Sequence, residues 1–212
     1  MSIFQQDNPF NAFMSRVGDL AMVNVAWAVC CLPVVTIGAS TAAMYETVRC
    51  MHEGRDEHVL KRFIAAFRRR FAVSLALEAI AVAFAIVATF DLWYLTKQVA
   101  DVNVASLAYG VIVAICLVAA AGYGFVLPVA SRSRLGVGAQ IAQSFRVALA
   151  HPVVALETLV LNALPIVVAV AVPGGLFPAL FFWGLLFTAS SAWIIVYLML
   201  QAGIIARPAD VR

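Results

Sequence analysis

Two acidic side chains inside long apolar runs are the residues of this chain best suited to chemistry. Glu78 and Glu157 each lie six or seven residues inside such a run. If both runs are helices, a rise of 1.5 Å per residue places both carboxylates about 10 Å below the start of the run. Two carboxylates at one depth could bind a cation or relay protons. The alternative is a structural ion pair with a flanking arginine, and the candidates for that role are Arg68, Arg69, Arg70 and Arg146.

Two asparagines complete the set of polar side chains in these runs. Asn24 and Asn162 are explained by hydrogen bonds between helices, without any substrate. Asn162 is followed by Pro165, and a proline kink frees backbone carbonyls that can line a cavity. The candidate polar site therefore consists of Glu78, Glu157, Asn162 and Asn24.

A metal site, a cofactor and an enzymatic activity are not expected. One short segment does contain metal-ligand residue types, but they do not recur in the paired spacing of known zinc sites. The sequence also lacks the motifs G-x-x-x-x-G-K-[ST], G-x-S-x-G and H-E-x-x-H, and we expect no catalytic residues. The segment with ligand-type residues comprises Cys50, His52, Glu53, Asp56, Glu57 and His58.

The composition of the chain predicts the environment of these residues. Of its 212 residues, 64% are hydrophobic and 12% are charged. Soluble domains average about 45–50% apolar and about 25% charged residues, so this chain has too little polar surface to cover a soluble fold. We therefore predict a single all-α domain over residues 1–212, a polytopic bundle of transmembrane helices in a lipid bilayer.

Five stretches have the length of about 20 apolar residues that a membrane helix needs. The third and the fifth contain no Asp, Glu, Lys or Arg, which is typical of a membrane span. Val34–Met51 could form a sixth or re-entrant segment, although its polar residues suit a lipid-facing helix poorly. The five predicted spans lie near 17–37, 71–95, 104–127, 153–172 and 177–203.

The basic residues predict the orientation of the bundle. If all five stretches cross, twelve of the 14 Lys and Arg residues fall on one side. Loops rich in Lys and Arg stay in the cytoplasm, which predicts a cytoplasmic C-terminus and an N-terminus outside. Arg16 and Lys97 are the exceptions, and a sixth segment at Val34–Met51 would bring Arg16 inside as well.

The segment between the first and second predicted spans has the pattern of an amphipathic helix. Three phenylalanines, Phe63, Phe67 and Phe71, share one helical face, and basic residues surround it. We expect a cytoplasmic helix that binds lipid headgroups or a partner protein; the alternative is a simple topology anchor. No nucleic-acid-binding module surrounds these basic residues. The candidate surface comprises Phe63, Phe67, Arg68, Arg69 and Arg70.

The run from Asn24 to Ala43 resembles the signature of the YesL family of bacterial membrane proteins, a domain of unknown function. The family pattern is N-x-x-W followed by L-P-x-x-T-x-G and small residues. Two further elements match, an F-x-x-x-F-[KR] motif and an Asp-Leu pair. The matching residues are Asn24, Trp27, Leu32, Pro33, Thr36, Gly38, Ala39, Ser40, Ala42, Ala43, Phe63, Phe67, Arg68, Asp91 and Leu92.

The resemblance implies a setting and a class of partner. Members of that family are often encoded beside sugar ABC-transporter and glycoside-hydrolase genes, typically in Gram-positive bacteria. We therefore expect a protein of the bacterial cytoplasmic membrane, a non-enzymatic accessory or regulatory component linked to carbohydrate uptake, with sugar ABC-transporter subunits as candidate partners. The alternative is a small transporter or channel that uses the intramembrane carboxylates. Five spans are few for a monomeric transporter, so that alternative implies a homo-oligomer.

Overall fold

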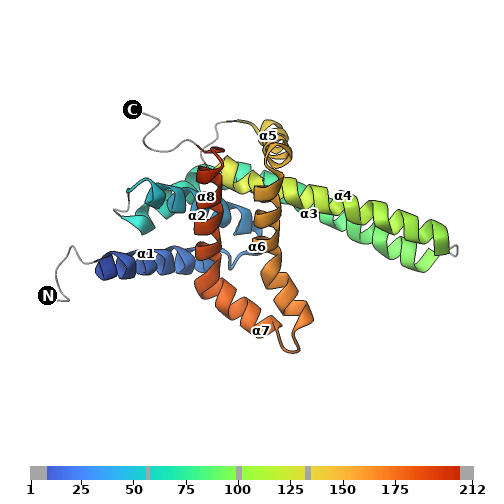
Figure 1. Ribbon diagram of the computed structural model, residues 1–212, viewed down its shortest axis with the longest axis horizontal. Helices are drawn as coiled ribbons and strands as arrows, with labels where there is room; N and C mark the ends of the chain where they lie inside the picture. Colours follow the sequence, from blue (N-terminus) through green and yellow to red (C-terminus); the bar gives the residue numbers. More distant parts are fainter. Residues whose placement is uncertain (1–8, 56–57, 99–101, 132–134, 206–212) are drawn as a thin grey trace.

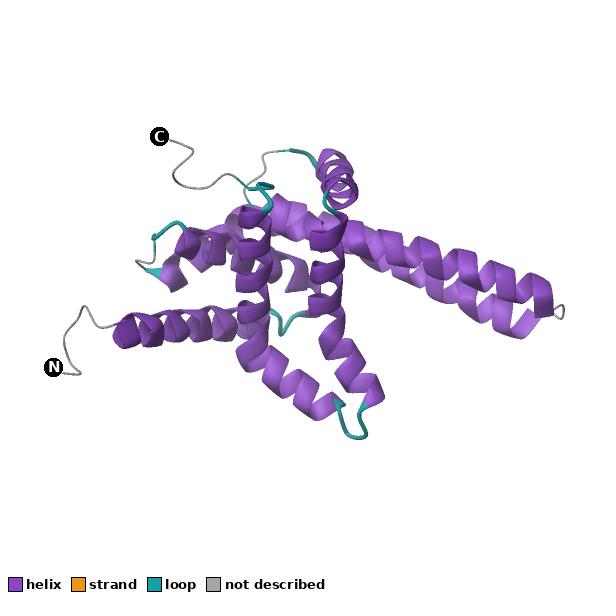
Figure 2. Cartoon of the chain, in the orientation of Figure 1, coloured by secondary structure: helices purple, strands orange, loops and turns teal. Residues whose placement is uncertain are grey.

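Every regular element in the described part of the chain is a helix. The computed structural model describes residues 9–55, 58–98, 102–131 and 135–205, and the all-α expectation is confirmed for them (Figures 1 and 2). In chain order the elements are α1 (Pro9–Cys30), the 3-10 turn η1 (Val34–Thr36), α2 (Ile37–His52), α3 (Val59–Gln98), α4 (Val102–Ala130), α5 (Val137–Ala150), α6 (Pro152–Ala171), α7 (Leu176–Pro178), the π-helix η2 (Ala179–Phe187) and α8 (Thr188–Gln201).

Three of the described helices, α3, α4 and α6, are long and apolar enough to cross a membrane. The segments Leu176–Gly184 and Thr188–Gln201 pass the same test as a pair bent by 64°, and they add a fourth span if the pair crosses as one. These helices contain the last four of the five predicted spans. The first, near 17–37, has no such counterpart, because α1 carries Arg16 and Asp19 and ends at Cys30. Membrane-helix character is thus supported, while the number five is not confirmed.

The helices α1 and α2 form an antiparallel hairpin. Near its open end the Arg16 guanidinium Nη1 donates to the Met51 carbonyl oxygen at 3.3 Å. Nearer the turn, the Trp27 indole Nε1 donates to the Thr41 hydroxyl at 3.1 Å. At the turn itself the Thr36 hydroxyl donates to the Pro33 carbonyl oxygen at 2.6 Å. The chain therefore reverses at Pro33, and both ends of the hairpin lie on the same side.

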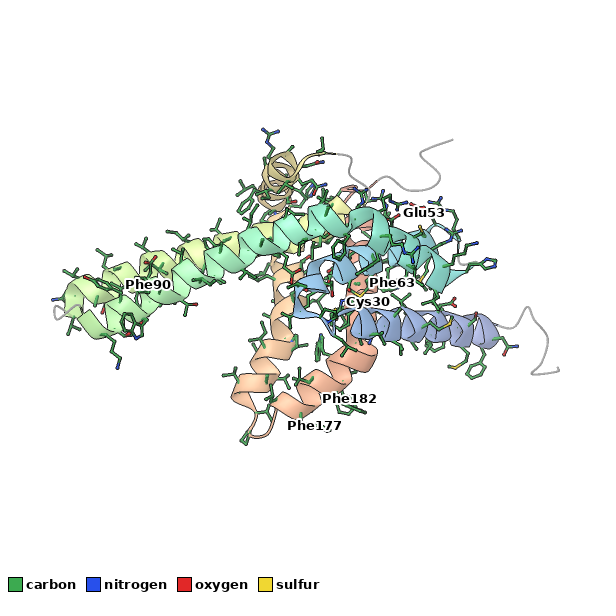
Figure 3. The ribbon with its side chains drawn as sticks, turned by 180° about the vertical axis from the view of Figure 1, so that it is seen from behind. Cys30, Glu53, Phe63, Phe90, Phe177 and Phe182 are labelled. Atoms are coloured by element: carbon green, nitrogen blue, oxygen red, sulfur yellow. The ribbon has the colours of Figure 1, made fainter. Side chains whose placement is uncertain are left out.

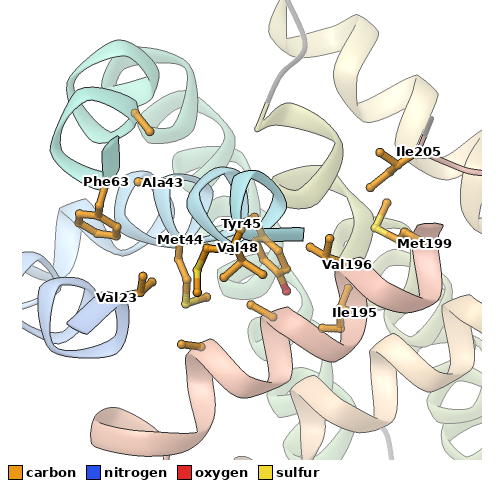
Figure 4. Close-up of a cluster of buried hydrophobic side chains, with 14 of the residues drawn as sticks. Val23, Ala43, Met44, Tyr45, Val48, Phe63, Ile195, Val196, Met199 and Ile205 are labelled. Atoms are coloured by element: carbon orange, nitrogen blue, oxygen red, sulfur yellow. The ribbon is translucent and has the colours of Figure 1, made fainter. Parts of the chain in front are cut away.

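The second helix of this hairpin is the most enclosed element of the fold. α2 packs against α1, α3, α4 and α8, so protein rather than lipid covers its polar residues. Small residues allow this close packing, since Ala39, Ala42 and Ala43 are all buried. The main hydrophobic core lies around α2 (Figure 4), and its labelled members are Val23, Ala43, Met44, Tyr45, Val48, Phe63, Ile195, Val196, Met199 and Ile205.

The expected separate amphipathic helix is the first three turns of α3. This helix runs unbroken for 40 residues, which corresponds to about 60 Å, whereas the hydrocarbon core of a bilayer is about 30 Å thick. If α3 crosses a bilayer, part of its length must therefore lie outside the hydrocarbon. Figure 3 shows Phe63 beside the body of the molecule and Phe90 far along the helix.

The α3–α4 hairpin extends away from the body of the molecule. Figure 1 shows it leaving in a direction crosswise to α6 and α8. Its apolar side chains are exposed all round, for example Ile86 at 64% and Leu107 at 73%. In an isolated soluble chain this much exposed apolar surface would be unstable, so lipid or a neighbouring protein must cover the hairpin.

Candidate functional site

Two of the four predicted polar residues form hydrogen bonds to other helices, and the other two are exposed. Glu78 lies on α3, where its Oε2 accepts a hydrogen bond of 2.9 Å from the backbone N–H of Gly38. Gly38 belongs to the first turn of α2, whose N–H groups have no partner within their own helix. The positive end of the helix dipole also favours a carboxylate at this point. Glu78 therefore caps α2 from a neighbouring helix.

A glycine is required where this cap forms. A Cβ atom at position 38 would lie 3.0 Å from the Glu78 Oε2 and 3.1 Å from the Ser74 carbonyl oxygen. Those distances are shorter than ordinary van der Waals contacts, so a side chain here would push α2 away from α3. This explains the glycine of the L-P-x-x-T-x-G pattern in physical terms.

Asn24 holds together the bent helix at the other end of the chain. Its Nδ2 donates to the Gly184 carbonyl oxygen at 2.8 Å, and its Oδ1 accepts from the Ala189 N–H at 2.7 Å. Gly184 lies in the π-helix η2 and Ala189 is the second residue of α8, so Asn24 bridges the junction between the two. The Asn24 side chain is fully buried. It supplies partners to backbone groups at the junction where the helix changes type.

Glu157 and Asn162, which both lie on α6, are less enclosed than Glu78 and Asn24. Both are exposed in the chain. The amide of Asn162 donates to the Thr158 carbonyl oxygen of its own helix at 2.9 Å. Glu78 is bonded to α2 rather than placed with Glu157, so the structure gives these two carboxylates separate surroundings.

Near the start of α3, the ion pairs between described residues involve carboxylates other than Glu78. Arg69 pairs with Glu46 of α2, while Arg49 and Arg55 both pair with Glu53. The first of these ion pairs joins α3 to α2, and the other two lie within the end of α2 and its following loop. Among the described residues no arginine forms a salt bridge to Glu78, and the proposed structural pair is replaced by the cap on α2.

The predicted surface on Phe63 and Phe67 needs correction. Phe63 is fully buried and Phe67 packs against the core, so neither forms the exposed apolar stripe. The three phenylalanines do lie near one helical face, but α1 and α2 cover that face at Phe63. Arg68 and Arg69 are exposed, Arg70 is half-buried, and Phe71 is 38% exposed.

A different apolar and basic face is exposed on these turns of α3. At 100° per residue, Leu60, Ile64 and Phe71 lie within one narrow sector, with Lys61 and Arg68 beside it. Leu60 is 51% exposed and Ile64 is 43% exposed. The sequence contains the signal for this face, but the regular phenylalanine spacing draws attention to the buried one. We call Leu60, Lys61, Ile64, Arg68 and Phe71 the α3 basic face.

The segment with metal-ligand residue types does not gather its side chains into one site. His52 stacks on Trp193 of α8 with ring centroids 3.6 Å apart, and Glu53 is engaged by Arg49 and Arg55. In the described part of the chain, no group of three or more His, Cys, Asp or Glu side chains could hold a metal ion. Asp56 and Glu57 lie outside the described residues.

A cavity of about 800 Å³ lies between the α1–α2 hairpin and the helices α6, α7, η2 and α8. Asn162 and Pro165 line it, as their spacing suggested, together with Trp27, Cys31 and Tyr45 of the hairpin. Tyr45 was not expected at a site, because a tyrosine in an apolar helix carries no distinctive sequence signal. The cavity exists only because the hairpin turns back beside the bent helix.

The comparisons with known proteins concern the first half of the chain. A family model described as "Protein of unknown function, DUF624" matches residues 20–92. No curated protein and no solved structure matches the chain. The matched residues run from the middle of α1 to the outer part of α3, and they include the Asn24 bridge and the Glu78 cap. Over this stretch the chain is similar to a family whose function is not known.

Proposed function

We propose that this protein is a non-enzymatic accessory or regulatory component of a bacterial cytoplasmic membrane, linked to carbohydrate uptake. The observation that carries the proposal is the α3 basic face. It combines exposed apolar side chains with Lys61 and Arg68, on a helix that continues directly into the membrane. Such a face suits a partner that is itself at the membrane surface. The resemblance to the YesL family supports sugar ABC-transporter subunits as that partner.

The orientation that we propose places the α3 basic face in the cytoplasm. If α3, α4, α6 and the bent pair all cross, the α3–α4 hairpin lies parallel to α6 and α8 in the bilayer rather than crosswise as in Figure 1, and the end of α8 and the start of α3 lie on one side. The α1–α2 hairpin brings Arg16 to that same side, because Arg16 contacts the end of α2. In this topology Lys97 is the one basic residue placed outside, whereas five spans would place both Arg16 and Lys97 there. This topology therefore agrees better with the positive-inside rule. The hairpin enters the membrane from the cytoplasm and turns at Pro33.

Charge reversal on the α3 basic face tests the proposed partner. The double substitution Lys61→Glu and Arg68→Glu should reduce co-purified transporter subunits about tenfold or more, because rim charges that complement a partner become repulsive. The measurement is native purification in mild detergent with quantitative mass spectrometry. Lys97→Glu reverses one charge at the opposite end of the same helix and should leave recovery unchanged, and Lys61→Glu is the single substitution to compare with it. Equal recovery from the double variant and the parent would refute the proposal.

A small oligomeric transporter or channel is a second candidate function, and Glu157 is the observation that favours it. This carboxylate is exposed on α6, a candidate span, and a carboxylate facing lipid is costly without a partner. A second copy of the chain could supply that partner across a pore.

For this second function, Glu157→Gln should lower cation or proton flux into proteoliposomes about tenfold while leaving the fold intact. The measurement is dye-reported flux from vesicles of defined protein content, with protein-free vesicles as the background. Full flux in the glutamine variant, or no flux above background in the parent, would exclude this role for Glu157.

A further inference from the structure

We propose that the cavity between the α1–α2 hairpin and α6–α8 binds an uncharged single-chain lipid with a hydroxyl or ester group. None of the side chains that line the cavity is acidic or basic. A charged ligand would therefore lose its hydration without gaining a counter-charge. The volume of about 800 Å³ falls within the range of about 300–1,000 Å³ typical of small-molecule sites.

The rim of the cavity indicates that the ligand enters from lipid rather than from water. Leu32, Ile166, Leu176 and Leu180 all line the cavity and are 61–80% exposed. These side chains continue the apolar surface of α6 and of the bent helix, which the bilayer covers. An aqueous solute would have to cross this apolar rim, whereas a lipid chain meets it directly.

A buried phenol supplies the polar contact inside the cavity. Tyr45 lines the cavity and is only 4% exposed. Figure 4 shows its ring leaving α2 with the hydroxyl directed toward α8. A phenolic hydroxyl can donate one hydrogen bond and accept others, so Tyr45 offers a ligand both kinds of bond.

Two further polar groups line the cavity from other helices. On α6, the hydrogen bond from Asn162 to the Thr158 carbonyl oxygen uses the Nδ2 atom and leaves the Oδ1 atom available. On α8, the cavity is lined by Ser191, which carries a hydroxyl. Together with Tyr45 they offer both donors and an acceptor from three different elements. An ester carbonyl and a hydroxyl on one lipid headgroup would satisfy them, while the acyl chain fills the apolar remainder. The cavity and the α3 basic face share no residue, so this proposal is independent of the proposed function.

Photolabelling of the full chain tests the proposal. The probe is a monoacylglycerol with a diazirine on its acyl chain, added to the protein in phosphatidylcholine vesicles. We expect the label within residues 161–169 and 176–192, and we expect unlabelled monoacylglycerol to compete with it. Tyr45→Phe removes one hydrogen bond and should weaken competable labelling about three- to tenfold. Uniform labelling of the outer faces of α3 and α4 without competition would overturn the proposal.

A pair of variants on α6 separates cavity binding from general lipid contact. Ala169→Phe fills the cavity and should abolish competable labelling. Val167→Phe is the matched control, because Val167 is 54% exposed and lies outside the cavity lining, and its labelling should equal that of the parent. Identical labelling in the two variants, or full labelling in Tyr45→Phe, would also contradict the proposal. Thermal unfolding in micelles confirms beforehand that each variant is folded.

Discussion

Replacing Asn24 with leucine is expected to lower the free energy of unfolding by about 2–4 kcal/mol, because it removes both hydrogen bonds that this buried side chain makes to backbone groups. The Gly184 carbonyl oxygen and the Ala189 N–H each bond to this one side chain. They lie where the π-helix η2 meets α8, so water or an ordinary helical bond does not readily replace the lost partner. Unfolding in mixed micelles at increasing denaturant concentration measures the loss.

The other intramembrane asparagine is the control for this variant. Asn162→Leu removes only a bond to the Thr158 carbonyl oxygen within its own helix, and the Asn162 side chain is exposed. Its effect should remain below about 1 kcal/mol. A similar loss in the two leucine variants would show that Asn24 does not act as the bridge that its geometry indicates.

The second large effect is expected at the α2 cap. Glu78→Ala should destabilise the protein by about 2–3 kcal/mol, since it removes a charge-assisted hydrogen bond and an anion at the N-terminus of a buried helix. Glu78→Gln retains an acceptor oxygen for the Gly38 N–H and should lose only about half as much. The same micelle unfolding assay, combined with helix content by circular dichroism, reports both changes.

Glu157→Ala is the matched control for the cap. Glu157 is exposed on α6, so its removal should not lower the free energy of unfolding by more than about 0.5 kcal/mol. If Glu78→Ala is as stable as Glu157→Ala, the cap is not important to folding, and a role for Glu78 in proton or cation movement becomes the better explanation.

The two pairs of variants share one physical basis. Asn24 and Glu78 both supply hydrogen bonds to backbone groups that a broken or short helix leaves unsatisfied. Both lie within the residues that match the family of unknown function. Their place in that stretch is therefore explained by the hairpin and the bent helix, without assigning either side chain a role in catalysis or transport.

Much of this fold follows from composition and periodicity alone. Apolar runs of helical length cannot be satisfied in water, which predicts an all-α membrane protein. The last four predicted spans coincide with α3, α4, α6 and the bent pair, because charges and glycine-rich turns interrupt the runs between them. The intramembrane polar residues could also be identified in advance, since any Asn or Glu in such a run stands out.

The tertiary structure alone decided which of the α3 phenylalanines, and which of the two glutamates, packs against another helix. Phe63 and Phe71 share a helical face, yet α1 and α2 cover only Phe63. Glu78 and Glu157 lie at similar depths in their runs, yet only Glu78 meets the N-terminus of another helix. Periodicity identifies a face of a helix, but it contains no information on which neighbour packs there or how far along the helix that contact extends. The reversal of the chain at Pro33 determines the burial of Phe63 and the contact of Glu78, because it places α2 between α1, α3 and α8.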